Sequence, residues 1–332
     1  MHMADALVSP AVGGIMYACS AAVAAYSVRK IKLEADPLKV PVMGVMGAFV
    51  FAAQMINFSI PGTGSSGHLC GGMLLTALLE PYASFLTLLS VLLIQCLLFA
   101  DGGLLALGAN VWNMAFYGCI IAFFCVWKPV MKNGLSKGKV VAASIIGSVL
   151  SLQLGSFSVT LQTLASGNSE LPFSVFLGVM QPIHLAIGLV EGLITAAVLI
   201  FIYEARPELL QAPQTEGRKN RFSLKKVVII LGIVAVLTGG VLSHFASSSP
   251  DGLEWSIEKT SGQEELEAEG DIYERAQSVQ EKTSFLPDYA FKDSDTSAGT
   301  SFSGIFGALA VVLVCAGVCL LVKWIQKRNS KA

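Results

Sequence analysis

Long runs of apolar residues alternate with shorter polar segments along this chain of 332 residues. Several runs reach about 20 residues, the length that a helix needs to cross the ~30 Å hydrocarbon core of a membrane. Pro81 closes the third run, because proline cannot continue a helix from the preceding turn. A membrane β-barrel would instead show weak alternating segments of about 10 residues. The pattern predicts an all-α membrane protein with nine transmembrane helices, at residues 8–28, 40–59, 69–79, 82–100, 106–127, 140–160, 176–203, 224–244 and 302–322.

The basic residues of the chain indicate how these helices are oriented. Eighteen of the 22 Lys and Arg residues follow the first, fifth, seventh and ninth helices, which end on one side if the helices alternate in direction. The positive-inside rule makes that side cytoplasmic, so we expect the N-terminus outside and the C-terminus inside a cell membrane. The four basic segments are residues 29–39, 128–139, 206–226 and 323–331.

Two polar segments divide the chain into units. A basic cytoplasmic linker, residues 206–223, separates a seven-helix unit at 1–205 from a two-helix unit at 224–332. Within the second unit, residues 245–301 form an exported loop that holds 13 Asp or Glu residues against four Lys or Arg. Such a polar segment cannot bury a large core, so we expect part of it to lack stable structure.

Composition and motifs exclude several classes of function. Only 14% of the residues are charged and the net charge is −1, without a basic stripe, so no nucleic-acid partner is indicated. The nearest likeness to a phosphate-binding loop, at residues 134–139, has the wrong spacing and no Ser or Thr after the lysine, so we expect no ATP site in this chain. No HExxH motif or nucleophile–base pair occurs, so we do not expect an enzyme.

The first two residues could hold a metal ion. There is no Lys or Arg before the first apolar run, so we expect no cleavable signal and a mature chain that keeps Met1. The α-amine of Met1, the backbone nitrogen of His2 and its imidazole could then bind one metal in fused rings, with a fourth nitrogen from His68 on the same membrane face. Four nitrogens in a plane suit Ni(II) or Cu(II), and Co(II) less ideally. A solvated terminal histidine and an ordinary loop histidine are the alternatives.

Other polar residues could support such a site. His68 follows the glycine-rich stretch at residues 62–67, which includes Ser66 and could fold inward or be a plain linker. Asn110 and Asn113, at the outer start of the fifth helix, could hydrogen-bond to the metal ligands or simply join helices.

The seventh predicted helix also carries polar residues on one face. Gln181, His184, Gly188 and Glu191 are spaced by three, four and three residues. Ionisable groups inside a membrane usually face the bundle interior. His184 and Glu191 could therefore form a structural pair or a relay for protons or metal.

Four stretches in this order, "MHMADALVSP", "GTGSSGHLCGG", "DGGLLALGANVWNM" and "IHLAIGLVEGLITA", resemble the CbiM/NikM family, the substrate-binding S components of energy-coupling-factor transporters for cobalt and nickel. The likeness covers about residues 1–205. The remainder resembles the small companion subunit CbiN/NikN, so the chain looks like a fusion of the two. The motif that carries this second likeness is Pro250, Asp251, Gly252, Leu253 and Glu254.

The resemblance implies a function and a set of partners. In the family, the N-terminal amine, the histidine at position two and the histidine of the "GHL" loop bind Co2+ or Ni2+, which here gives Met1, His2 and His68. The implied partners are a transmembrane coupling subunit of the CbiQ/NikQ type and ATPase subunits of the CbiO/NikO type, in the lipid of a prokaryotic inner membrane. The N-type unit would help to load or hold the metal-site loops. Met3-Ala4-Asp5 departs from the commoner family pattern, which leaves the chelate intact but the choice of metal open.

Two alternatives share the metal but not the mechanism. A proton-coupled secondary carrier would use His184 and Glu191 and need no ATPase. A membrane metal sensor would bind the ion and signal through the exported loop without uptake.

Overall fold

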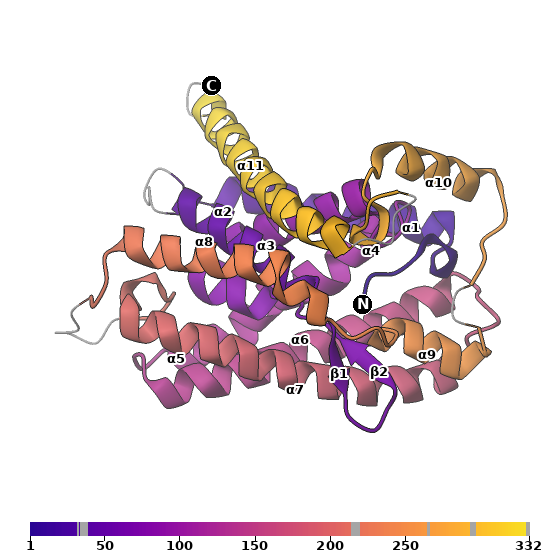
Figure 1. Ribbon diagram of the computed structural model, residues 1–332, viewed down its shortest axis with the longest axis horizontal. Coiled ribbons are helices and arrows are strands. Elements are labelled where there is room, and N and C mark those ends of the chain that lie inside the picture. Colours follow the sequence, from indigo (N-terminus) through magenta and orange to yellow (C-terminus); the bar gives the residue numbers. More distant parts are fainter. Residues whose placement is uncertain (32, 34–38, 214–219, 264–265, 293–296, 330–332) are drawn as a thin grey trace.

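The computed structural model describes residues 1–31, 33, 39–213, 220–263, 266–292 and 297–329. Parts of the predicted basic segments and of the exported loop, at 32, 34–38, 214–219, 264–265, 293–296 and 330–332, lie outside the described residues. Almost all of the described secondary structure is helical, which confirms the expected all-α membrane protein (Figure 1).

Six helices in the described part of the chain are long and apolar enough to cross a membrane. The third of them is continuous from Leu107 to Met131 and has π-helical geometry along most of its length. A shorter apolar helix, α2 (Lys39–Gln54), and a 17-residue helix, α8 (Leu224–Gly240), accompany them. The six are α1 (Pro10–Lys30), α3 (Gly72–Phe99), the run α4 (Leu107–Asn110) through η2 (Val111–Ile121) and η3 (Phe123–Trp127) to α5 (Lys128–Met131), α6 (Lys137–Ala165), α7 (Phe173–Ala205) and α11 (Ser297–Asn329).

The structure differs from the predicted helices in two places. The predicted third and fourth helices form one element, α3, which is broken at Glu80 by backbone angles of φ 66° and ψ 163°. Pro81 explains the break, since it disfavours helical geometry in the residue before it. The helix predicted at 40–59 ends at Gln54, because the chain beyond it forms a β-strand.

The glycine-rich stretch forms a small hairpin. Strands β1 (Phe58–Ile60) and β2 (Ser65–Gly67) pair antiparallel, with Ser59 opposite Ser66. Gly62 and Gly64 have φ values of +78° and +75°, a region that favours glycine, so the turn between the strands depends on them. The hairpin ends one residue before His68 and thereby fixes where that side chain enters the bundle.

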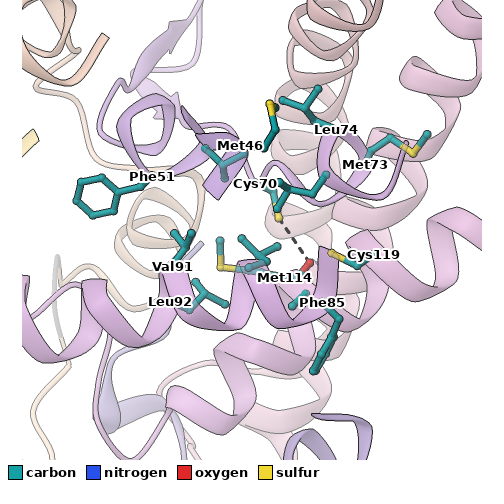
Figure 2. Close-up of a cluster of buried hydrophobic side chains, with 14 of the residues drawn as sticks. Met46, Phe51, Cys70, Met73, Leu74, Phe85, Val91, Leu92, Met114 and Cys119 are labelled. Atoms are coloured by element: carbon teal, nitrogen blue, oxygen red, sulfur yellow. Dashed lines mark hydrogen bonds between the residues drawn. The ribbon is translucent and has the colours of Figure 1, made fainter. Parts of the chain in front are cut away.

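Buried side chains around the first turns of α3 form the centre of the first unit. Met73, Leu74 and Phe85 are fully buried there, and sulfur-containing side chains are prominent among them (Figure 2). The Cys70 thiol donates to the carbonyl oxygen of Met114 at 3.7 Å. This packing contacts the loop after His68 through Cys70. Methionine side chains are unbranched and flexible, so they can fill irregular spaces in such a core.

The second unit packs against the first. Helices α8 and α11 contact each other and α2. The exported loop, for which partial disorder was expected, holds two helices in the described residues: α9 (Gly252–Ser261), which packs on α7, and α10 (Asp271–Thr283), which packs on α3. The described parts of the loop thus dock on the first unit, although α10 has no buried residue of its own.

The crossing of α8 and α11 is close enough to require glycine. A Cβ atom added at Gly304 would lie 2.1 Å from the carbonyl oxygen of Gly239, whereas one added at Gly317, on the same helix, would meet nothing within 4 Å. We expect Gly304→Val to destabilise the protein by about 1–3 kcal/mol through overpacking. The melting temperature in detergent should fall for Gly304→Val and stay unchanged for Gly317→Val; equal shifts would contradict the packing argument.

Candidate metal centre

The N-terminal residues run into the helix bundle. Met1 is 5% exposed and Met3 is fully buried. Oδ1 of Asn110 accepts the backbone N–H of Met3 at 2.7 Å, and Nδ2 of Asn110 donates to the Met3 carbonyl at 3.1 Å. The backbone N–H of Gly103 donates to the same carbonyl at 2.9 Å. These bonds hold the first two residues at a defined place.

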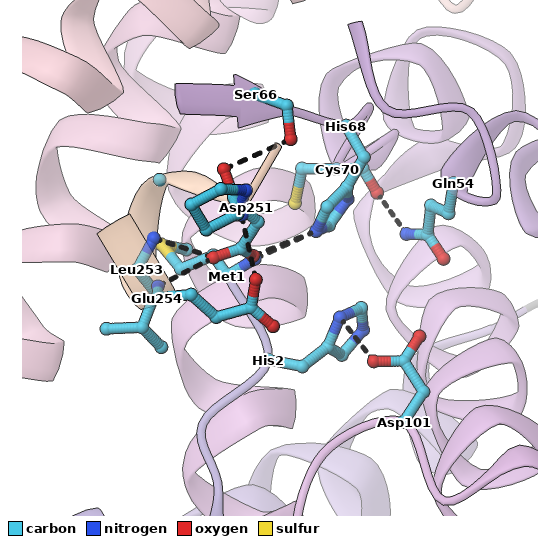
Figure 3. A network of polar contacts seen from close by, with 12 residues as sticks. Met1, His2, Gln54, Ser66, His68, Cys70, Asp101, Asp251, Leu253 and Glu254 are labelled. Atoms are coloured by element: carbon cyan, nitrogen blue, oxygen red, sulfur yellow. Dashed lines mark hydrogen bonds and ion pairs between the residues drawn. The ribbon is translucent and has the colours of Figure 1, made fainter. Parts of the chain in front are cut away.

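The amine of Met1 lies between a histidine and a carboxylate from the two units of the chain (Figure 3). Its nitrogen is 2.8 Å from Nε2 of His68 and donates to Oδ2 of Asp251 at 2.5 Å. Nε2 of His68 is itself 3.7 Å from Oδ2 of Asp251. Met1 and Asp251 are both largely buried. Removing either charge would therefore leave the other buried without a partner, which destabilises the fold.

His2 completes the group of nitrogens. Its ring stacks on that of His68, with centroids 5.2 Å apart and planes 16° apart. Nδ1 of His2 lies 3.1 Å from Oδ1 of Asp101, and Nε2 is buried and has no hydrogen-bond partner among the described residues. Burial lowers the pKa of His2 to about 4, against the opposing charge of Asp101. The imidazole is therefore neutral at neutral pH, as a metal ligand must be.

Hydrogen bonds to the second unit hold the hairpin over the site. The backbone N–H of Ser66 donates to the carbonyl of Pro250 at 2.8 Å, and its hydroxyl donates to the carbonyl of Ser249 at 2.7 Å. The indole N–H of Trp255 donates to the carbonyl of Thr63 at 3.1 Å. Of the two readings of the glycine-rich stretch, the structure shows the inward fold and not a plain linker.

The five-residue motif at 250–254 forms the start of α9. The side chain of Asp251 accepts from the backbone N–H groups of Leu253 and Glu254, and Glu254 accepts from the N–H of Asp251, so the two form a capping box. Burial works against ionisation of Asp251, but the charged amine of Met1 and His68 hold its pKa well below the usual range. A carboxylate is thus fixed beside the amine.

The polar residues of α7 have structural partners. Nδ1 of His184 is 2.8 Å from the carbonyl of Met180, and the ring lines a small cavity together with Met1, His68 and Asp251. The carboxylate of Glu191 accepts the backbone N–H groups of Cys70 and Gly71, at 2.8 and 3.1 Å. Glu191 therefore positions the loop that follows His68, and it does not pair with His184.

Asn113 acts near the site without touching either candidate histidine. It exchanges two hydrogen bonds with Gln162, at 2.8 and 2.9 Å, and donates to the Met3 sulfur at 3.3 Å. Like Asn110, it therefore supports the terminal residues through Met3.

Sequence reasoning missed two acidic partners. Asp101 lies in the turn after α3, and its contact with His2 was not expected. Asp251 was noted only as part of a motif, not as the partner of the N-terminal amine. Both are acids in segments that the sequence predicts on one membrane face. The available signal in the sequence was that carboxylates often accompany metal-binding histidines.

The arrangement has the chemistry of a nitrogen chelate. No cluster of three His, Cys, Asp or Glu side chains with metal-binding geometry occurs in the described residues. The Met1 amine beside His68 is a nitrogen donor that such side-chain clusters do not include. Two nitrogens at neighbouring corners of a square, each about 2.0 Å from a central metal, lie about 2.8 Å apart. The separation of the Met1 amine from Nε2 of His68 is 2.8 Å.

Comparisons with known proteins find relatives named for cobalt and nickel. A family model described as the cobalt uptake substrate-specific transmembrane region matches residues 2–209, and a PDGLE domain model matches residues 225–324. A relative from Archaeoglobus fulgidus, named for fused nickel transport (NikMN), is 33% identical over 94% of this chain and 96% of its own length. The fused nickel transport protein NikMN of Rhodobacter capsulatus is 30% identical over 72% of this chain and 74% of its own.

A solved structure shows a likeness over part of the chain. The crystal structure of a truncated transition metal transporter superposes with a TM-score of 0.54 at 29% identity, over 61% of this chain and 99% of that one.

Asp251→Asn tests the buried ion pair. Removing one member of a buried pair costs about 3–5 kcal/mol, so we expect a clear fall in melting temperature at neutral pH. Since the folded-state pKa of Asp251 is depressed, its stabilisation is present above pH ~4 and is lost as the pH falls towards the folded pKa. The gap between wild type and variant, measured from pH 7 down to pH 3, should therefore narrow. Asp271→Asn, an exposed acid in the first turn of α10, is the control; an equal effect there would refute the pairing.

Proposed function

The chain belongs to the CbiM family of cobalt-uptake transmembrane regions and carries a PDGLE domain after it, and from this premise we propose how it captures its ion. It is a component of cobalt or nickel transport, and its substrate is Co2+ or Ni2+. The metal binds to the amine of Met1, the backbone nitrogen and Nδ1 of His2, and Nε2 of His68. The observation that carries the proposal is the buried amine 2.8 Å from Nε2 of His68.

Charge balance supports these ligands. In the metal-free chain, the ammonium of Met1 and the carboxylate of Asp251 cancel. A bound dication displaces one proton from the amine and one from the amide of His2. Its two positive charges are then matched by the deprotonated amide and by Asp251. The charges of the metal, the amine, the amide and Asp251 therefore sum to zero in both states, so neither state leaves a buried charge at the amine unpaired.

Membrane placement and partners follow the family. We assign the hairpin, the turn at Asp101 and residues 245–301 to the outer side of a prokaryotic inner membrane, with the C-terminus in the cytoplasm. By analogy with the family, we propose that the energy for uptake comes from ATPase subunits of the CbiO/NikO type through a coupling subunit of the CbiQ/NikQ type.

A secondary carrier that relays protons through His184 and Glu191 is the competing mechanism. Both oxygens of Glu191 accept backbone N–H groups, and Nδ1 of His184 contacts a backbone carbonyl. These contacts favour structural roles for both residues over a relay.

Substitution of the ligands tests the site. We expect His2→Ala and His68→Ala to abolish Ni(II) binding in calorimetry on the purified chain, because each removes a nitrogen donor. Acetylation of the Met1 amine should do the same, since it removes that nitrogen as a donor. His244→Ala is the control, because that exposed ring contacts Ser301 within the second unit, away from the proposed ligands. A chain with an acetylated terminus that binds Ni(II) normally would refute the terminal chelate.

Reconstitution tests the energy source. In proteoliposomes, we expect ATP-dependent uptake only when the coupling and ATPase subunits accompany the chain. His184→Gln, which keeps a hydrogen-bonding side chain, should leave most of that uptake. Uptake by the chain alone, driven by a proton gradient and lost in His184→Gln, would support the secondary carrier, whereas binding without any uptake would support the sensor.

A further inference from the structure

A second segment of the exported loop reaches the site separately from Asp251. Gln280 makes this contact: its Nε2 donates to the carbonyl oxygens of Cys96 at 3.0 Å and of Gly102 at 2.8 Å. The backbone N–H of Leu286 donates to the carbonyl of Leu98 at 3.3 Å. The loop is thus fixed on the end of α3 and on the turn that carries Asp101.

This docking brings Tyr289 to Asp101. The hydroxyl of Tyr289 donates to Oδ2 of Asp101 at 2.5 Å. Its ring stacks on Phe99, with centroids 4.7 Å apart and planes 18° apart, and also contacts Phe51. The residue has a φ of +59°, which is uncommon for a bulky side chain. A conformation of this kind persists only where surrounding contacts determine it, as the stacking and the hydroxyl contact do here.

Asp101 uses its two oxygens for two different residues. Oδ2 takes the Tyr289 hydroxyl, and Oδ1 lies 3.1 Å from Nδ1 of His2. The turn is tight against His2, since a Cβ atom added at Gly102 would lie 3.2 Å from Cβ of His2. A chain of contacts therefore runs from the second unit through Asp101 to one ligand of the proposed chelate (Figure 3 shows its His2–Asp101 end).

The contact between Asp101 and His2 also affects how the imidazole of His2 can bind the metal. Chelation with the amine and the backbone nitrogen needs Nδ1 of His2, because only Nδ1 closes a six-membered ring. In the metal-free structure, Asp101 faces that atom, while the buried Nε2 has no hydrogen-bond partner in the described residues. Turning the ring about its Cβ–Cγ bond presents Nδ1 to the metal and brings the Nε2 edge towards Asp101. Histidine ligands commonly donate their other N–H to a carboxylate, which orients the ring and strengthens the metal bond.

We propose that Asp101, held by Tyr289 of the exported loop, is a positioning residue that orients the imidazole of His2 and retains the bound metal. The second unit then controls the two ends of the terminal chelate by separate contacts, Asp251 at the amine and Tyr289 with Asp101 at the imidazole. This inference rests on the proposed function and adds to it the residues that set the lifetime of the bound ion.

Two conservative variants test the proposal on the full chain in detergent, with Ni(II) alone as the probe. Loss of an outer partner of a metal ligand typically weakens metal binding about 10- to 100-fold. We expect that loss for Asp101→Asn, and a release rate about 10-fold faster for Tyr289→Phe, which keeps the stacked ring. Tyr273→Phe is the matched control, because that hydroxyl lies in the same loop and donates to the carbonyl of Val8.

Additional readouts separate positioning from general loosening. Positioning predicts an unchanged visible absorption band of square-planar Ni(II), since the four nitrogens stay the same. For Asp101→Asn and Tyr289→Phe, it also predicts that the metal-free chain melts at the wild-type temperature, and that Ni(II) is released faster but associates at the wild-type rate. Tyr273→Phe should match the wild type in each measurement. Wild-type release rates in both variants, or a lowered metal-free melting temperature that accounts for the change, would overturn the proposal. Normal Ni(II) binding by His2→Ala would instead overturn the proposed function, and this inference with it.

Discussion

The burial of the chain's first amino group is the constraint on which the site depends. A charged ammonium in a largely closed environment needs a partner, and it has one in Asp251, which lies 250 positions away in sequence. The contact ties the beginning of the first unit to the second. It also explains why the hairpin, the start of α9 and the terminal residues are held by hydrogen bonds among themselves. If any of them moved away, a buried charge would lose its partner, which is expensive in free energy.

Much of the fold could be predicted because membranes impose simple rules. The length and apolarity of the runs identify the spanning helices, and Pro81 marks the break that the structure shows at Glu80. The hairpin was harder to predict, because three-residue strands carry no periodicity, and they depend on Gly62, Gly64 and contacts with Pro250. The helices α9 and α10 were missed for a related reason, since they are polar and are ordered by docking rather than by a core of their own.

The candidate site, like the fold, could be predicted from the sequence only in part. The nitrogen donors could be predicted because only a terminal histidine offers an amine, an amide and an imidazole in fused rings. Their acidic partners could not, since Asp101 and Asp251 are two among 23 acidic residues and only the folded chain brings them to the terminus. Glu191 is the opposite case: its place inside a helix suggested chemistry, yet its carboxylate is used to hold the backbone at Cys70 and Gly71.

The distance between Met1 and Asp251 along the chain has a consequence for biosynthesis. The ribosome makes the first residue long before it makes the carboxylate that neutralises it, and both must reach the same side of the membrane. Through most of translation, the amine has no permanent counter-charge and the pocket around it stands unfinished. Assembly of the ion-binding centre is therefore one of the last events in maturation of the polypeptide. Chains truncated before α9 would insert their early helices and keep the contacts of Met3 with Asn110, but the amine would lack its carboxylate.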